Sequence, residues 1–276
     1  MGLRIATNTA AQMVQKNIKQ TGKASGEALE KLSSGKRINK SADDAAGLAI
    51  AKNMEAQVKG LRQASRNAND GISMVQTAEG AMNETSNILV RLRELSVQAA
   101  SDTIGDTERG FLDKEYQQLV KEVDRIAEST KFGSISLLNG SGSEMDIQVG
   151  TFAGESGQIQ YDPSQTNATA SALNISGLSV ASKDDARGSM ENVDEAITSL
   201  SEQRANLGAV QSRLQSSVNN LEIQATNLDA SRSVIEDADV AYESSQLASS
   251  NIAKQAGIAS LAQANNINSA ALRLVG

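Results

Sequence analysis

The residue types that carry most protein chemistry are absent from this chain. Its 276 residues include no histidine and no cysteine. Without histidine it lacks the usual general base and the commonest metal ligand. Without cysteine it lacks disulfides, thiolate zinc sites and thiol nucleophiles. The composition therefore offers no catalytic, cofactor-binding or metal-binding residues, and it predicts that the chain is not an enzyme and needs no cofactor.

Charge is the chemical signal that remains, and it is unevenly distributed. The formal net charge of −7 argues against nucleic acid as the main partner. Residues 1–40, however, hold eight lysines and arginines against Glu27 and Glu30. A basic amphipathic arm could bind a membrane surface or be captured as calmodulin captures its targets. The plainer interpretation, which we favour, is a solvated helix face that pairs with an acidic neighbour in an assembly.

Short sequence patterns add little to this. In the middle of the chain, Asn167 and Asn174 each begin an Asn-x-Ser/Thr pattern, which matches the glycosylation acceptor but more often marks an exposed polar loop. No hydrophobic run approaches the ~18 residues of a membrane span. The N-terminus lacks the apolar core of a cleavable secretory signal. We therefore expect no membrane insertion and no cleaved signal.

The chain is organised around a narrow apolar stripe at coiled-coil spacing. Alternate steps of four and three residues meet Val193, Ile197, Leu200, Arg204, Leu207, Gln211, Leu214, Val218, Leu221, Ala225 and Leu228. All but the arginine and the glutamine are apolar. This spacing predicts one long α-helix, roughly 50–60 Å in length. A stripe of that length has to be buried against partner helices.

Two other segments supply matching helices. Residues 44–99 predict a very long helix; Asp70-Gly71 could be a turn inside it, but the heptad continues in phase, which favours an unbroken helix. After a loop at residues 101–106, residues 107–129 repeat the spacing. Aromatic residues are only 2% of the chain, which suits thin helical layers. The expected fold is mainly α, a long antiparallel helical bundle or coiled coil.

The composition changes between about residues 131 and 186, where Gly, Ser and Thr cluster. Alternating runs at 145–149 and 158–161 predict a β-hairpin with an exposed tip. This segment is too small for a robust domain of its own. We expect it to cover one end or flank of the bundle.

The two ends of the chain predict helices too weak to fold alone. Their apolar residues are sparse, and those that we assign to polymerisation are Ile5, Met13, Ile18, Leu29, Leu32, Leu247, Ile252, Leu261 and Leu272. We expect residues 1–32 and 240–276 to be largely disordered in the monomer. In an assembly they should become paired helices that pack on their neighbours' equivalents. The basic arm should then lie beside an acidic joint at 233–239.

Seven stretches resemble the sequence signatures of bacterial flagellins. In the N-terminal half they are Leu29-Glu-Lys-Leu-Ser-Ser-Gly-Lys-Arg-Ile-Asn39, Asp43-Asp-Ala-Ala-Gly-Leu-Ala-Ile50, Asp70-Gly-Ile-Ser-Met-Val-Gln-Thr-Ala-Glu-Gly80 and Arg93-Glu-Leu-Ser-Val-Gln98. In the C-terminal half they are Gln203-Arg-Ala-Asn-Leu-Gly-Ala-Val-Gln-Ser-Arg-Leu214, Glu236-Asp-Ala-Asp-Val-Ala241 and Leu261-Ala-Gln-Ala-Asn265. The resemblance covers nearly the whole chain.

The resemblance implies a division into two domains. Residues 1–40 and 235–276 would form the inner domain of terminal helices that lines the tube, and residues 41–234 the outer helical bundle. The hairpin insert would occupy about 131–186. Larger flagellins insert further domains in the middle, and with only about 55 residues there, this chain should lack them.

The resemblance also implies a function and a set of partners. The chain would polymerise with itself into the extracellular flagellar filament for swimming motility. It would be exported by the flagellar type III route, without a cleavable signal peptide, and would meet an export chaperone, junction proteins and cap proteins. The alternative is the hook–filament junction protein, which shares this architecture. From another class, a cytoplasmic coiled-coil signalling module would share the heptads, but not the unstable helices at both ends.

One last implication concerns animal hosts. Flagellins are sensed by a Toll-like receptor through a face that corresponds here to Arg91, Leu95 and Glu115. The competing interpretation, which we place first, is that these residues make contacts between subunits.

Overall fold

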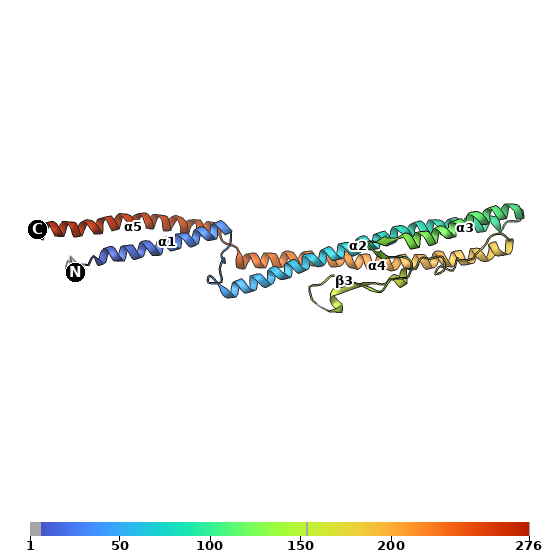
Figure 1. Cartoon of the computed structure of the whole chain (residues 1–276), viewed down its shortest axis with the longest axis horizontal. Coiled ribbons are helices and arrows are strands. Elements are labelled where there is room, and N and C mark those ends of the chain that lie inside the picture. Colours follow the sequence, from blue (N-terminus) through green and yellow to red (C-terminus); the bar gives the residue numbers. More distant parts are fainter. Residues whose placement is uncertain (1–6, 153, 276) are drawn as a thin grey trace. The chain divides into compact units, whose positions relative to one another are not determined.

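In the computed structural model, the described backbone consists almost entirely of helices (Figure 1). It covers residues 7–152 and 154–275; the side chains of Glu155 and of residues 267–275 are not described. The α-helices in this part of the chain are α1 (Thr9–Ser34), α2 (Ala45–Ala99), α3 (Asp106–Ser129), α4 (Lys183–Glu236) and α5 (Val240–Val275). Short strands and 3₁₀ turns lie between α3 and α4. The predicted fold class, mainly α with a small β-hairpin region, is confirmed.

The chain divides into two compact units. Unit 1 joins the residues up to Ala56 with those from Asn227 onwards, and unit 2 spans Gln57–Thr226. The long helices α2 and α4 contribute to both. Because this division describes a single chain, the boundaries at 40/41 and 234/235 stay a prediction about the assembled form.

The apolar stripe of α4 is buried along its whole length. Val193, Leu200, Leu207, Leu214, Val218 and Leu221 are buried, and Ile197 and Leu228 are partly buried. α2 supplies the facing side chains in unit 2, including Val58, Leu61, Ala68, Ile72, Val75, Met82 and Leu89. Each fully buried side chain of this kind contributes about 1.5–3 kcal/mol relative to its exposed state. One charged pair interrupts the seam: a guanidinium nitrogen of Arg204 lies 3.9 Å from a Glu79 carboxylate oxygen.

The predicted continuity of α2 through Asp70-Gly71 is confirmed. Gly71 is buried, and a Cβ placed there would lie 2.8 Å from Cδ1 of Ile147 and 3.4 Å from Cδ1 of Leu214. The glycine therefore serves close packing of α2 against the hairpin and α4 instead of a turn.

The turn from α2 to α3 is held by an arginine that sequence patterns did not single out. Arg109 is buried, and its guanidinium donates to the carbonyls of Ala99 (2.8 Å) and Ser101 (2.9 Å) and to the carboxylate of Asp106. The last carbonyls of a helix lack partners within that helix. Arg109 satisfies one of these at the end of α2 and so fixes α3 on the bundle.

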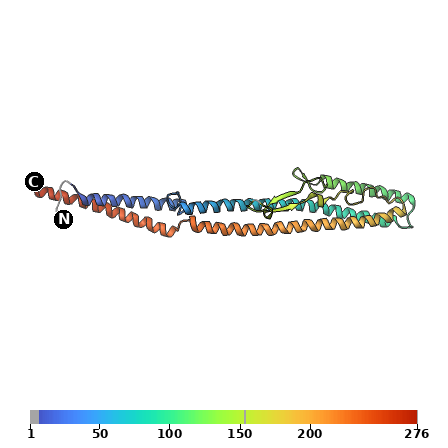
Figure 2. The ribbon, with the colours of Figure 1, turned by 90° about the horizontal axis from the view of Figure 1, so that it is seen from below.

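The middle segment contains two antiparallel hairpins. The predicted one pairs β3 (Met145–Gln148) with β4 (Gln158–Tyr161), with Ile147 opposite Ile159. The second, β1 (Lys131–Phe132) with β2 (Ile135–Ser136), was not predicted, because two-residue strands show no alternation. Figure 2 shows α3 and the β3–β4 hairpin following one another along α2 and α4.

The helix α4 extends beyond the apolar stripe at both ends. It begins ten residues before Val193, at Lys183, where the Ser182 hydroxyl accepts from the backbone N–H of Asp185 and acts as an N-cap. It also continues to Glu236, past Leu228, the last residue of the stripe. The predicted acidic joint at 233–239 is therefore mostly helix, and only Asp237–Asp239 connects α4 to α5.

Candidate functional site

The end helices, α1 and α5, pack on each other within one chain. The fully buried residues of their contact surface are small or polar, and they include Ala28, Glu243, Ser250 and Ala264. A Cβ at Gly257 would lie 2.8 Å from Cγ1 of Ile18, so the glycine admits this side chain between the helices. Packing of these helices on neighbouring copies stays a prediction, and α1 and α5 of the same chain already cover each other in part.

The same pairing leaves much of their apolar surface in water. Met13 and Ile252 are each 69% exposed, and Leu29 is also exposed. Ile18, Leu32, Leu247 and Leu261 are partly buried between the helices. Ile5 and the side chain of Leu272 lie outside the described residues. These exposed apolar side chains are therefore available for contact with a partner.

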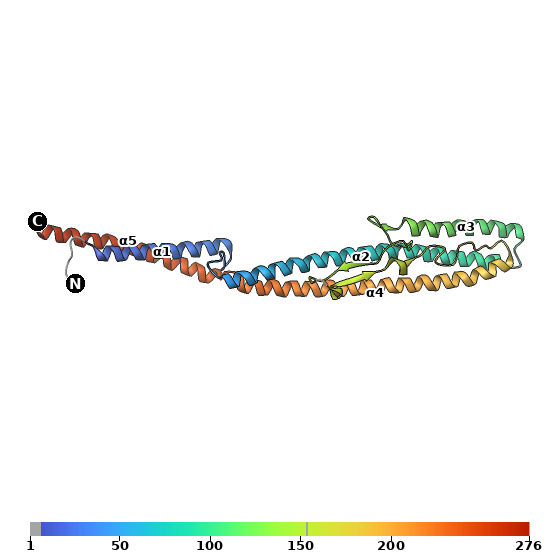
Figure 3. The same cartoon turned by 60° about the horizontal axis from the view of Figure 1, so that its bottom comes forward.

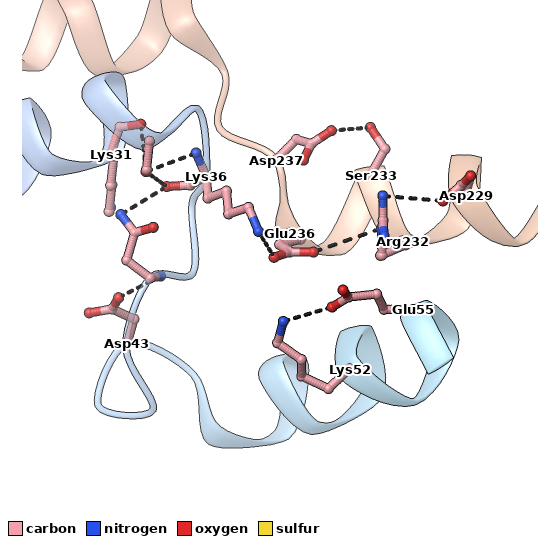
Figure 4. A network of polar contacts seen from close by, with 12 residues as sticks. Lys31, Lys36, Asp43, Lys52, Glu55, Asp229, Arg232, Ser233, Glu236 and Asp237 are labelled. Atoms are coloured by element: carbon pink, nitrogen blue, oxygen red, sulfur yellow. Dashed lines mark hydrogen bonds and ion pairs between the residues drawn. The ribbon is translucent and has the colours of Figure 1, made fainter. Parts of the chain in front are cut away.

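A network of polar contacts joins the chain after α1 to the end of α4 (Figure 4). The Lys36 ammonium contacts the carboxylate of Glu236, which is only 5% exposed, and the Arg232 guanidinium lies 3.9 Å from the same carboxylate. The backbone adds two bonds: Arg37 N–H donates to the Glu236 carbonyl (2.7 Å) and Ala238 N–H to the Gly35 carbonyl (3.0 Å). The predicted contact between the basic arm and the acidic joint is thus present between Lys36 and Glu236.

The other two acidic residues of the joint have different partners. Asp237 accepts a hydrogen bond from the Ser233 hydroxyl. Asp239 accepts from the backbone N–H groups of Ala241 and Tyr242, which makes it the N-cap of α5.

The residues of the N-terminal signature fix the backbone between α1 and α2. Gly35 ends α1 with φ = 70°, a conformation that suits glycine at a helix C-terminus. Asp43 accepts from the backbone N–H groups of Lys40 and Asn39, and these hydrogen bonds lower its carboxyl pKa. Asp44 caps α2 through the Gly47 N–H. These carboxylates hold backbone and show no arrangement for catalysis.

The proposed receptor face is only partly on the surface. The Arg91 guanidinium is exposed and bridges Glu115 on α3 (2.8 Å) and Glu94 on α2 (3.0 Å), and its pKa is raised by these carboxylates, Glu115 foremost. Leu95, by contrast, is 0% exposed. At this level α2 is covered by α3 on one side and by α4 on another, so Leu95 cannot present its side chain to a partner in this fold.

No cluster of three or more candidate ligands among the described residues could hold a metal ion. Among the same residues, no helix combines the length and apolarity that crossing a bilayer requires.

Comparison with known proteins agrees with this architecture. The model of the bacterial flagellin N-terminal helical region matches residues 5–143, and that of the C-terminal helical region matches residues 190–275. A flagellin of Halalkalibacterium halodurans is 42% identical over 90% of each chain. The flagellar filament core protein flaB2 of Brachyspira hyodysenteriae is 39% identical over 98% of this chain and 99% of its own.

A solved structure extends the similarity to the fold. The crystal structure of Bacillus cereus flagellin is 32% identical, covers 60% of this chain and 94% of its own, and superposes with a TM-score of 0.51. Two family models in the right order, together with relatives that align along nearly the entire sequence, leave one conclusion: this chain is a member of the bacterial flagellin family.

Proposed function

We infer that the chain is the self-assembling structural subunit of a bacterial flagellar filament, the polymer that turns motor rotation into swimming thrust. This inference rests on a difference in burial between the apolar seam of unit 2 and the apolar side chains of the end helices α1 and α5. Unit 2 buries most of its apolar seam, whereas α1 and α5 keep Met13, Leu29 and Ile252 exposed. Neighbouring subunits can cover these side chains. The relatives named flagellin or filament core protein favour this role over the hook–filament junction protein.

The test is to remove the ends and ask what is lost. A fragment of Ser41–Asp239 should remain helical by circular dichroism, because it keeps the whole α2–α4 seam, and should stay monomeric in sedimentation. The full chain should form filaments of uniform width in electron micrographs. If the fragment formed filaments, or if it unfolded completely, the α2–α4 seam would not be what stabilises the monomer or the end helices would not be what polymerises it.

The position of the exposed residues also supports finer proposals. We assign the inner, tube-lining domain to residues 1–40 and 235–276 and the outer domain to residues 41–234. The exposed apolar face of α5 is a surface that an export chaperone could cover before assembly and that junction and cap proteins could contact afterwards. Export would proceed by the flagellar type III route, without a cleaved signal, to an extracellular filament. Binding of a purified chaperone to the full chain, but not to the Ser41–Asp239 fragment, would support the chaperone proposal.

A second proposal is sensing by a host Toll-like receptor through Arg91 and Glu115. Its support is that both side chains are exposed and held against each other across α2 and α3. Monomeric Arg91→Ala should then lower the response of receptor reporter cells at least tenfold. Arg125→Ala, which removes an exposed arginine elsewhere on α3, is the matched control. Equal responses from the two variants would assign Arg91 to subunit contacts alone.

A further inference from the structure

A groove of unit 2 lies between the tip of the β3–β4 hairpin and α4, and Figure 3 shows the hairpin beside that helix. Two adjoining hollows of about 330 and 270 Å³ form the groove, and both are lined by Val149, Ser156 and Ser217. We call it the hairpin groove. Small-molecule pockets of proteins begin at about 300 Å³, so the groove is large enough for a small ligand.

The deep part of the hairpin groove is apolar and its α4 side is polar. Val149, Ile159 and Leu221 line it and are buried. On α4, exposed hydroxyl and carboxamide side chains recur every four residues along the groove, at Ser212, Ser216, Asn220 and Gln224. Residues at this spacing lie along one face of a helix, so they form a row of roughly 18 Å. Hydroxyl and carboxamide groups both donate and accept hydrogen bonds.

One charged side chain lines the hairpin groove among the described residues, that of Arg213. Arg213 is exposed, and in the described part of the chain its guanidinium makes no hydrogen bond and no ion pair. Between Gln203 and Leu221, α4 carries Arg204 and Arg213 but no acidic residue. A guanidinium binds a carboxylate through two parallel N–H···O bonds. The groove therefore offers a ligand carboxylate an arginine that no carboxylate of the described residues occupies.

An exposed aromatic ring lies at the edge of the hairpin groove. Phe152 lines the groove and is 76% exposed. The Gln148 side-chain amide donates to the carbonyls of Gly150 (2.8 Å) and Phe152 (3.2 Å), and so fixes the backbone that carries the ring. A Cβ at Gly157 would lie 2.9 Å from the Phe152 carbonyl oxygen, so a side chain there would displace this part of the tip. The ring is therefore held where a ligand in the groove can cover its face.

We propose that the hairpin groove binds an acidic saccharide, that is, a short chain of sugar rings that carry carboxylates. Each part of the groove matches one part of such a ligand. The Phe152 ring packs on the C–H face of one sugar, the polar row on α4 exchanges hydrogen bonds with sugar hydroxyls, and the Arg213 guanidinium pairs with a carboxylate. An apolar ligand would cover the row and the guanidinium without pairing them, which costs binding free energy. The groove lies within unit 2 of one chain, so this binding does not depend on the filament function.

Because the chain contains no tryptophan, Phe152→Trp places a single fluorescent reporter at the groove and keeps an aromatic ring there. Titration of this variant, as the full-length monomer, with tetragalacturonate should give a saturable change in fluorescence. Maltotetraose has the same number of sugar rings but no carboxylate, and it should bind at least tenfold more weakly. No saturable change with tetragalacturonate would overturn the proposal. Equal affinity for the two saccharides would also overturn it, because the carboxylates would then play no part.

Calorimetry tests the same site without the reporter. Phe152→Ala and Arg213→Gln should each weaken the binding of tetragalacturonate at least tenfold relative to wild type. Phe111→Ala and Arg125→Gln are the matched controls, because they remove an exposed ring and an exposed guanidinium from α3, and both should bind as wild type does. All four variants should melt as wild type does, since none of the replaced side chains is buried. Groove variants that bind like the controls would overturn the proposal.

Discussion

The α2–α4 pair and the α1–α5 pair are both long antiparallel helix pairs, but their seams are built from different residues. The first places Leu, Ile, Val and Met opposite one another and buries nearly all of them. The second buries Ala28, Ser250 and Glu243 and turns Met13 and Ile252 outwards. Helical spacing alone therefore does not show which pair stabilises a monomer. The size of the residues on the inner face shows it, because stabilisation follows the apolar area removed from water.

The largest expected effect comes from breaking the apolar seam. Leu207→Pro removes a backbone donor and a buried side chain from the middle of α4, and should cost unit 2 at least about 3 kcal/mol. Thermal unfolding followed by circular dichroism measures the loss. Leu207→Met, which keeps the volume, should cost less than about 1.5 kcal/mol. A proline variant that melts with wild type would show that α4 is not packed there.

A smaller effect is expected in the small-residue seam. Gly257→Val would push branched carbons against Ile18 and force α1 and α5 apart, at a cost of about 1–3 kcal/mol. The effect should appear in filament growth, where these helices must be ordered, more than in monomer melting. Gly26→Ala is the control, because no atom lies within 4 Å of its added Cβ. It should instead strengthen α1 by about 0.5–1 kcal/mol. Equal behaviour of the two variants would show that α1 and α5 do not pair as described.

Alkaline pH should destabilise unit 2, because its core contains two buried tyrosines. Burial raises the pKa of the Tyr116 and Tyr161 hydroxyls, so the folded state favours their neutral forms. The stability that they contribute is complete below the unfolded tyrosine pKa of about 10 and is lost as the pH rises from that value through the higher pKa of the folded state. Melting temperature should fall above pH 10. A double Phe variant that falls as steeply would assign the loss to other groups.

The smallest effects distinguish these two tyrosines from each other. The Tyr161 hydroxyl bonds to the Leu137 carbonyl and to Thr166. The buried Tyr116 hydroxyl lies beside the Ser96 and Ser189 hydroxyls, which donate to backbone carbonyls, and it makes no hydrogen bond of normal geometry among the described residues. Tyr161→Phe should cost about 1 kcal/mol, and Tyr116→Phe should be neutral or slightly stabilising. Denaturant melts of the two variants decide this. A larger loss from Tyr116→Phe would reveal a bond to its hydroxyl.

Sequence periodicity predicted what depends on neighbouring residues in the chain. It located all the long helices and the β3–β4 hairpin, because each repeats an apolar position over many residues. It did not locate the ends of α4, which depend on a capping serine at one end and on polar contacts near Lys36 at the other. Sequence periodicity did not predict the two-residue strands β1 and β2, because they contain no repeat.

Sequence patterns did not predict contacts between segments that are far apart in the chain. The resemblance placed Leu95 on a binding face, but only the packing of both α3 and α4 around α2 shows that it is buried. Likewise, nothing local pairs Lys31 with Glu243, 212 positions away.

The Glu79–Arg204 pair within the α2–α4 seam has a consequence for how the chain finds its fold. Heptad stripes of similar residues can align equally well one repeat out of step, so an apolar seam alone permits sliding errors. A shift of seven residues would place Arg204 opposite Ile72 or Ser86 in place of Glu79. Both side chains of the pair are partly exposed, so the lost contact costs less than a buried one would, but one polar position is enough to fix alignment in coiled coils. The pair, at 3.9 Å, therefore favours the alignment in which the hairpin, the α2–α3 turn and the ends of both helices fit together.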